Sequence, residues 1–188
     1  MSLFLTKLDL RNKKVLDFPD VRQSRSYTCG ASALQAILYY YGLSFREDEL
    51  EALLHIDPKN GTAPRDIVRL CQHFALNVDE KQHMTIADLK SYLKRKIPVL
   101  VTMQAWNNTL QSYHKLWNSG HYSVVIGIIS DFVIFEDPSL IGRGVLTINE
   151  FMDRWHDIDK YGHHYINYGI AIYGKRIKYH SDRLTRIL

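Results

Sequence analysis

The sequence predicts an α+β fold in which an N-terminal helical half packs against a C-terminal antiparallel β-sheet. In the first half of the 188 residues, apolar side chains recur at helical spacing. In the second half they gather in short β-rich runs separated by turn residues. The composition, 46% apolar and 23% charged, is that of a folded protein. The length suits a single domain over residues 1–188.

The first two helices are predicted from their start and stop signals. The first begins near Cys29 and continues to Gly42, because glycine commonly follows the end of a helix. The second is expected to start at Ser44, with Glu47 three residues on as the partner in a capping box. Its inward-facing side chains are expected to be Leu50, Leu53 and Leu54.

Two further helices and a strand complete the first half. A helix that begins near Thr62 has an apolar stripe at i, i+3, i+4 and i+7, and Cys71 lies on this stripe. Thr85 and Asp88 predict the capped start of the next helix. Residues 97–101 then form an apolar, β-branched run that is typical of a strand. Since Cys71 lies on the apolar stripe of its helix, we expect it to be a core residue.

The second half predicts most of the sheet. Residues 121–129 and 132–135 are two β-rich runs that meet at a short turn, which indicates a hairpin. A short helix from Thr147, capped by Glu150, follows these strands. Residues 165–173 are expected to form the last strand. Helices therefore precede antiparallel strands, an order that predicts a cleft where the two halves meet.

The two ends of the chain and its charge exclude several classes of function. Residues 1–20 are expected to be an extended lead-in, and residues 175–188 a basic tail that accounts for much of the net charge of +4. A short basic tail gives no reason to expect nucleic-acid binding. The sequence has neither a signal peptide nor an apolar run long enough to cross a bilayer. We therefore expect a cytoplasmic protein without a membrane span.

Cys29 is the candidate nucleophile. A thiol at the first turn of a helix lies near the positive end of the helix dipole, which favours the reactive thiolate. The small residue Gly30 next to it is expected to let a substrate carbonyl approach the sulfur. A buried structural cysteine is the alternative for any single thiol, and it is the role we expect for Cys71. Both thiols are expected to be free.

His121 and Asp137 are the candidate base and its partner. Cysteine chemistry needs a base, and the base needs a group that orients its ring. If the chain reverses after residue 129, Asp137 returns beside His121. An uncertain register leaves Glu136 as a weaker candidate for the same role.

Gln23, in a polar loop before the nucleophile, can donate a hydrogen bond to an oxyanion together with the backbone N–H of Cys29. The remaining histidines lack ligands at metal-binding spacing, and no phosphate-binding loop or serine elbow is present. We expect neither a metal nor another cofactor.

The sequence resembles papain-fold peptidases related to the double-glycine leader peptidases, which process bacteriocin precursors. The resemblance rests on QSRSYTCGASALQAILYYYG from Gln23, GTAPRDIVRLCQHFAL from Gly61, GHYSVVIGIISDFVIFEDPS from Gly120 and GVLTINEFMDRWHDID from Gly144. It implies that Cys29 is the nucleophile, His121 the general base and acid, Asp137 the orienting residue and Gln23 the oxyanion residue.

The sequence departs from that family in two ways. Thr28 stands where transporter-fused relatives have an acidic residue, and the chain lacks their membrane helices and ATPase. The resemblance therefore implies a stand-alone member. Trp106 and Trp117, in the loop before the histidine, are candidate substrate contacts or loop anchors, and Gly120 beside the histidine is a further candidate contact.

The predicted function is thiol-dependent cleavage of peptide bonds in a peptide or protein substrate. Two alternatives remain open at this point. An acyl transferase, such as a transpeptidase or transglutaminase, uses the same triad with an amine as the acceptor. A binding module would recognise a peptide without cutting it.

Overall fold

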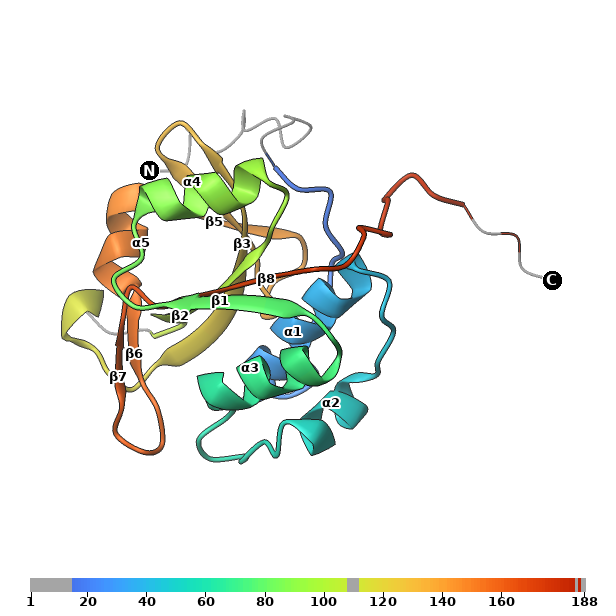
Figure 1. Ribbon diagram of the computed structural model, residues 1–188. Coiled ribbons are helices and arrows are strands. Elements are labelled where there is room, and N and C mark those ends of the chain that lie inside the picture. The colour runs from blue at the N-terminus through green and yellow to red at the C-terminus, as the bar shows by residue number, and fades with distance from the viewer. Residues whose placement is uncertain (1–14, 108–111, 185, 187–188) are drawn as a thin grey trace.

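The computed structural model describes residues 15–107, 112–184 and 186, and it confirms the α+β fold (Figure 1). The expected lead-in thus falls largely outside the described residues. The described helices are α1 (Cys29–Tyr40), α2 (Glu47–Leu53), α3 (Pro64–His73), α4 (Ile86–Lys94) and α5 (Ile148–Arg154), with a 3-10 turn η2 (Tyr113–Lys115).

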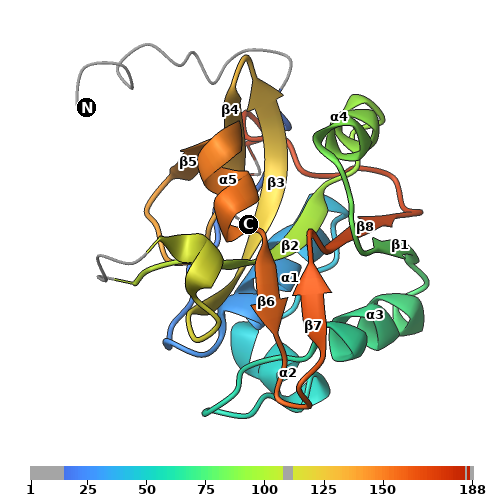
Figure 2. The ribbon, with the colours of Figure 1, turned by 90° about the vertical axis from the view of Figure 1, so that its left-hand side faces the viewer.

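The main sheet has six antiparallel strands in the order β1-β8-β2-β3-β4-β5. The short strands β6 and β7 form a separate hairpin, which projects away from the main sheet in Figure 2. The strands are β1 (Asn77–Lys81), β2 (Val99–Gln104), β3 (Gly120–Ile129), β4 (Phe132–Glu136), β5 (Arg143–Thr147), β6 (His156–Ile158), β7 (His164–Ile166) and β8 (Gly169–Tyr173).

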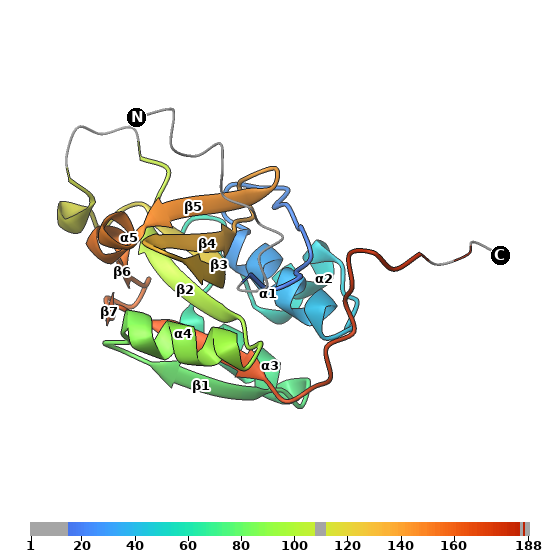
Figure 3. The same ribbon diagram turned by 90° about the horizontal axis from the view of Figure 1, so that it is seen from above.

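Helices cover both faces of the sheet. On β2, Leu100 packs with the side chains of α1 and α3, whereas its neighbours Val99 and Val101 pack with those of α4 and α5. This alternation follows from the two-residue period of a strand, which sends successive side chains to opposite faces. Figure 3 shows α1 and α2 on one side of the row of strands, with α4 and α5 on the other. The strand β3 also lies between the two apolar cores, with Val124 in one and Val125 in the other.

The predicted helix starts are confirmed except at α2. Thr85 and Asp88 form the capping box of α4, and Thr147 caps α5 with Glu150. The second helix does not start at Ser44; Arg46 precedes its first turn and Glu49 closes its capping box. The expected burial of Leu53 is also wrong, because this side chain is 39% exposed, while Leu50 and Leu54 are fully buried.

The strands differ from expectation at the edges. The expected strand 165–173 is divided into β7 and β8 by Asn167, whose φ of 45° breaks the extended backbone. The polar edge strand β1 pairs with β8 and was not predicted. The central hairpin of β3 and β4 is confirmed. Among the described residues, no helix has the length and apolar character needed to cross a membrane.

Candidate active site

Cys29 is the first residue of α1, at the end of the helix from which the backbone N–H groups point outward. Thr28, directly before it, is fully buried, and its Oγ donates a 2.9 Å hydrogen bond to the carbonyl of Arg25. This bond ties the preceding loop to the start of the helix. Cys29 itself is a free thiol that is partly accessible.

His121 and Asp137 lie next to each other at one end of the β3–β4 hairpin. In the register of this hairpin Val124 faces Glu136, so Asp137 follows directly at the end of the ladder. The Nε2 atom of His121 is 3.0 Å from both carboxylate oxygens of Asp137. The two residues are only 5% and 3% exposed. Since Asp137 binds Nε2, Nδ1 is the ring nitrogen left for another partner.

The carboxylate of Asp137 receives further hydrogen bonds. Ser123 Oγ donates to Oδ2, and the backbone N–H of Ser139 donates to Oδ1 at 2.9 Å. Burial alone would raise the pKa of Asp137, but the bonds from His121, Ser123 and Ser139 outweigh it and hold the pKa below its usual value. Asp137 is therefore held in its charged form.

The pKa of His121 is raised from 6.5 to about 9. Burial works against this shift, because it disfavours the charged ring. The hydrogen bond to Asp137 and the interaction with the neighbouring Cys29 sulfur more than compensate. His121 and the sulfur at the start of α1 are therefore neighbours in the fold, although they lie 92 positions apart in the sequence.

Glu136 has a different position from Asp137. Its buried carboxylate accepts a 2.7 Å hydrogen bond from the backbone N–H of Val21 and forms an ion pair with Arg143. The guanidinium of Arg143 also donates to the carbonyl of Pro19 at 3.1 Å. Glu136 thus anchors the segment that leads to α1 and makes no hydrogen bond to His121.

Gln23 lies in the loop between that segment and α1. Its backbone N–H donates to the carbonyl of Pro138 at 2.9 Å, next to Asp137. Its side-chain oxygen accepts from Ser139 Oγ at 3.1 Å, and Nε2 donates to the carbonyl of Arg25 at 2.9 Å. One of the two N–H groups on Nε2 remains after this bond.

Cys29 opens into a cavity of about 460 Å³ between the loop that precedes α3 and the β6–β7 hairpin. Trp117 and Gly120 line this cavity together with Tyr122. Trp117 also packs against the rings of His156 and His164, at centroid distances of 4.6 and 4.7 Å. It is thus both a loop anchor and a cavity wall.

The other candidate contacts have different surroundings. Trp106 is 57% exposed and lies edge-on to His121 at 6.2 Å. A Cβ atom at Gly30 would lie 2.9 Å from the Thr62 side chain and 3.2 Å from the Tyr122 ring. The space at Gly30 therefore serves the close packing of α1 on its neighbours rather than the approach of a substrate.

Asp157 also lines the cavity, and sequence reasoning did not single it out. It lies on the short strand β6, far from Cys29 in the sequence, and a single carboxylate in a polar segment gives no signal by itself. Cys71 is fully buried in the core, as predicted, and burial raises the pKa of its thiol to about 12. No group of three or more His, Cys, Asp or Glu side chains within the described ranges is arranged to hold a metal ion.

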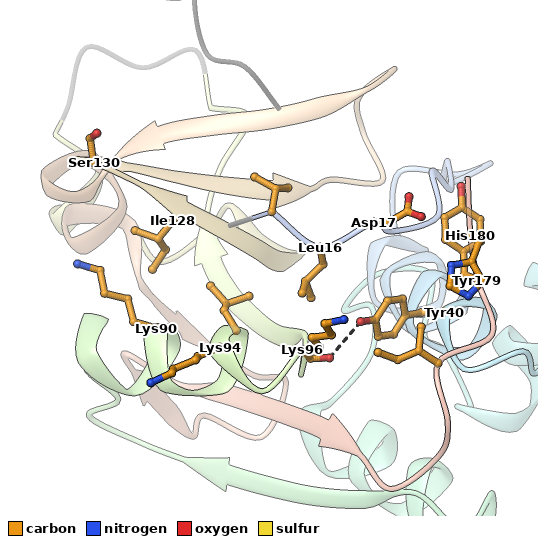
Figure 4. Close-up of a pocket in the computed structure, with 13 residues that line it drawn as sticks. Leu16, Asp17, Tyr40, Lys90, Lys94, Lys96, Ile128, Ser130, Tyr179 and His180 are labelled. Atoms are coloured by element: carbon orange, nitrogen blue, oxygen red, sulfur yellow. Dashed lines mark hydrogen bonds between the residues drawn. The ribbon is translucent and has the colours of Figure 1, made fainter. Parts of the chain in front are cut away.

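A larger cavity of about 890 Å³ lies at the other end of β3 (Figure 4). Leu16, Tyr40 and Ile128 form part of its wall, and Lys90 and Lys94 come from α4. The Tyr40 hydroxyl donates a 3.1 Å hydrogen bond to the backbone carbonyl of Lys96, which closes one side. Cys29 lines the smaller cavity and not this one, and His121 and Asp137 line neither.

Solved structures share this fold at low identity. The peptidase domain of Streptococcus ComA, a bifunctional ABC transporter involved in a quorum-sensing pathway, has a TM-score of 0.60 at 19% identity, over 86% of this chain and 99% of that one. A double-glycine-motif protease from an AMS/PCAT transporter, solved with a leader peptide, has a TM-score of 0.60 at 14% identity, over 86% and 95%. A structure described as a C39-like peptidase from Bacillus anthracis reaches 0.63 at 16% identity, over 88% and 99%.

The sequence comparisons give a family. No curated protein matches the chain. The family model that matches extends over residues 15–163, which includes the described residues from the segment before α1 to the β6–β7 hairpin. The solved structures agree with it in fold. The chain therefore belongs to the Peptidase_C39 like family.

Proposed function

We propose that this protein is a cysteine peptidase that cleaves peptide bonds with Cys29 as nucleophile. The observation that supports this most strongly is the buried His121, whose Nε2 lies 3.0 Å from both carboxylate oxygens of Asp137. In agreement with this geometry, Asp137 and the Cys29 sulfur raise the pKa of His121 to about 9 in spite of burial. Such a ring can hold a proton beside a thiolate at neutral pH. Membership of a peptidase-like family supports the same reaction class.

In the proposed mechanism, His121 holds the proton of the Cys29 thiol, and the thiolate attacks the carbonyl carbon of the scissile bond. The backbone N–H of Cys29 and the remaining N–H of Gln23 donate to the resulting oxyanion. His121 then protonates the leaving amine, which leaves a thioester on Cys29. Water, activated by the neutral ring, hydrolyses this thioester and restores the enzyme.

Asp137 has a positioning role in this scheme. Its contact with Nε2 leaves Nδ1 to exchange a proton with the sulfur, and its negative charge stabilises the imidazolium. Ser123 and Ser139 in turn hold the carboxylate in place. No step of this reaction calls for a metal or another cofactor.

The proposed substrate is a peptide or an exposed segment of a protein. The partly open cavity beside Cys29, about 460 Å³ in volume, has room for a few side chains of an extended chain. A structurally similar protease from an AMS/PCAT transporter was solved with a leader peptide, which supports a peptide ligand for the same fold.

The test is incubation of the protein with a diverse peptide library, read by mass spectrometry, beside the Cys29→Ala variant. We expect new termini with the parent protein and none with the variant. Cys71→Ala is the matched control, and it should retain cleavage because Cys71 lies in the core. The same reaction with an added primary amine separates hydrolysis from acyl transfer. Cleavage that persists in Cys29→Ala would overturn the proposal, as would an absence of any cleavage by the parent.

A further inference from the structure

One carboxylate in the Cys29 cavity has no role in the mechanism above. Asp157 lies on β6, and its Oδ1 atom accepts hydrogen bonds from Gln104 Nε2 at 3.0 Å and from the backbone N–H of Ile158 at 2.9 Å. Within the part of the chain that the structure describes, Oδ2 accepts none. Gln104 is completely buried, and its Oε1 accepts from the backbone N–H of Ser119, so the carboxylate is held by a fixed support.

The carboxylate lies directly over the backbone beside the proposed base. A Cβ atom at Gly120 would lie 2.6 and 2.7 Å from the two oxygens of Asp157, so only a glycine leaves room for them. Gly120 immediately precedes His121 on β3. Tyr122, on the same strand, interacts electrostatically with both Asp157 and Cys29. Asp157 and Cys29 line the same cavity, so a group that enters it can reach both the carboxylate and the sulfur.

Among the described residues that line this cavity, Asp157 is the carboxylate with an oxygen that accepts no hydrogen bond. Asp159 accepts hydrogen bonds from Tyr165 Oη at 3.0 Å and from the backbone N–H of Tyr161 at 2.8 Å, so its carboxylate is already used. Lys59 and Lys160 are exposed at the rim, where water screens their charges. A cation that enters the cavity thus meets one carboxylate with an oxygen free to accept from it.

We propose that Asp157 binds a cationic group of the substrate next to the scissile bond and so selects for positively charged substrates. The group is an ammonium or guanidinium, supplied either by a Lys or Arg side chain or by the free amino terminus of the peptide. This inference rests on the proposed peptidase function and adds a substrate class to it.

The electrostatics of Asp157 agree with this role. Burial raises the pKa of the carboxyl to about 7, although the bonds from Ile158 and Gln104 and the charge on His121 work in the opposite direction. His121 supplies a nearby positive charge but no hydrogen bond to this carboxylate among the described contacts. A half-buried carboxylate gains more from a cation than a fully exposed one does. An ammonium group in the cavity would be a hydrogen-bonded partner for Oδ2.

The test uses peptidyl acyloxymethyl ketones that label Cys29 as its sulfur displaces the carboxylate leaving group. Probes with an identical backbone carry lysine, norleucine or glutamate next to the ketone, and a second pair carries a free or an acetylated amino terminus. At about pH 8, where Asp157 is mostly ionised, we expect a cationic probe to label the parent about 10-fold to 100-fold faster than its neutral match. We expect Asp157→Asn to bring this ratio to about one.

The ratio of the labelling rates of two probes cancels any change common to both. A change in this ratio therefore reports on recognition of the cation and not on a general loss of structure. A parent without a preference for either cationic source would overturn the inference, and so would a preference that Asp157→Asn leaves unchanged. Labelling without selectivity, together with peptide cleavage, would refute the role of Asp157 and leave the peptidase proposal standing. A parent that no probe labels would refute both.

Two further variants complete the test. In Gly120→Ala the new methyl group would displace the Asp157 carboxylate, so the cationic preference should fall even if Asp157→Asn does not fold. Asp131→Asn removes an exposed carboxylate from the β3–β4 turn and should keep the preference. Loss of the preference in Asp131→Asn would contradict a local role for Asp157.

Discussion

Ser123 holds the carboxylate of Asp137 from the strand that also carries His121. Its Oγ donates a 2.5 Å hydrogen bond to Oδ2, and both residues are buried. A hydrogen bond to a charged group contributes about 1.5–3 kcal/mol, more than one between neutral groups. Ser123 therefore supports the orientation of the His121 ring, the proposed base, through Asp137.

For Ser123→Ala we predict a fall in kcat of about tenfold and a loss of about 2 kcal/mol in the free energy of unfolding. The reason is that Asp137 loses a donor and its pKa rises. Steady-state kinetics and urea denaturation measure the two effects. Ser91→Ala, an exposed position on α4, is the control and should change neither. Unchanged kcat in Ser123→Ala would contradict the support role.

The raised pKa of His121 predicts the alkaline limit of activity. The imidazolium must protonate the leaving amine, so kcat/KM should fall as the pH rises through about 9. The folded state favours the protonated ring; the stability that this contributes is complete below pH 6.5 and is lost as the pH rises through about 9. A pH–rate profile and urea titrations across this range measure both. An alkaline limit near 6.5 would disagree with the site.

Asp137→Asn should move this limit to lower pH, because the variant removes the main group that raises the His121 pKa. We also predict a fall in kcat of about 100-fold, since a neutral amide lacks the charge that stabilises the imidazolium. The pH–rate profile of the variant measures the shift. A profile that keeps the limit near pH 9 would show that Asp137 does not control the ring.

Gln23→Ala tests the oxyanion assignment. We predict a fall in kcat of about 100-fold with little change in KM, because the donor acts mainly in the transition state. Ser139→Ala removes only the hydroxyl that holds the Gln23 side-chain oxygen and should have a smaller effect in the same direction. A change confined to KM in Gln23→Ala would indicate substrate binding instead.

Arg143 and Glu136 are predicted to matter for stability rather than chemistry. Arg143→Met leaves the carboxylate of Glu136 buried without its partner, which should lower the free energy of unfolding by about 3 kcal/mol. Activity per folded molecule should persist at low temperature. Arg22→Met, at an exposed position, is the control and should stay within about 0.5 kcal/mol of the parent. Equal stability of the two variants would contradict the structural role of the pair.

Local signals predicted the helices well. The capping boxes at Thr85 and Thr147 depend only on residues three positions apart, so the sequence contains all of their information. The box expected at Ser44 fails for a nonlocal reason. Glu47 instead accepts hydrogen bonds from the Ser24 backbone N–H and from Ser32 Oγ, both distant in sequence. The sequence alone does not show that these long-range hydrogen bonds take Glu47 away from the predicted capping box.

Nonlocal pairing also explains the missed strand and the missed carboxylate. The strand β1 is polar and is defined by its partner β8, which lies about 90 residues later, so its own sequence has no strand signal. Asp157 is brought to Gly120 only by the fold. His121 and Asp137 were easier to pair, because a short hairpin joins them and fixes their register.

The most direct test of the account is the identity of the cysteine that a thiol-directed electrophile labels in the folded protein near neutral pH. Tryptic mapping by mass spectrometry should find the label on Cys29, with no labelling in Cys29→Ala and full labelling in Cys71→Ala. Labelling should also slow markedly in His121→Ala, because the ring stabilises the thiolate. Labelling of Cys71 in the folded protein, or of Cys29 at the same rate without His121, would contradict the account.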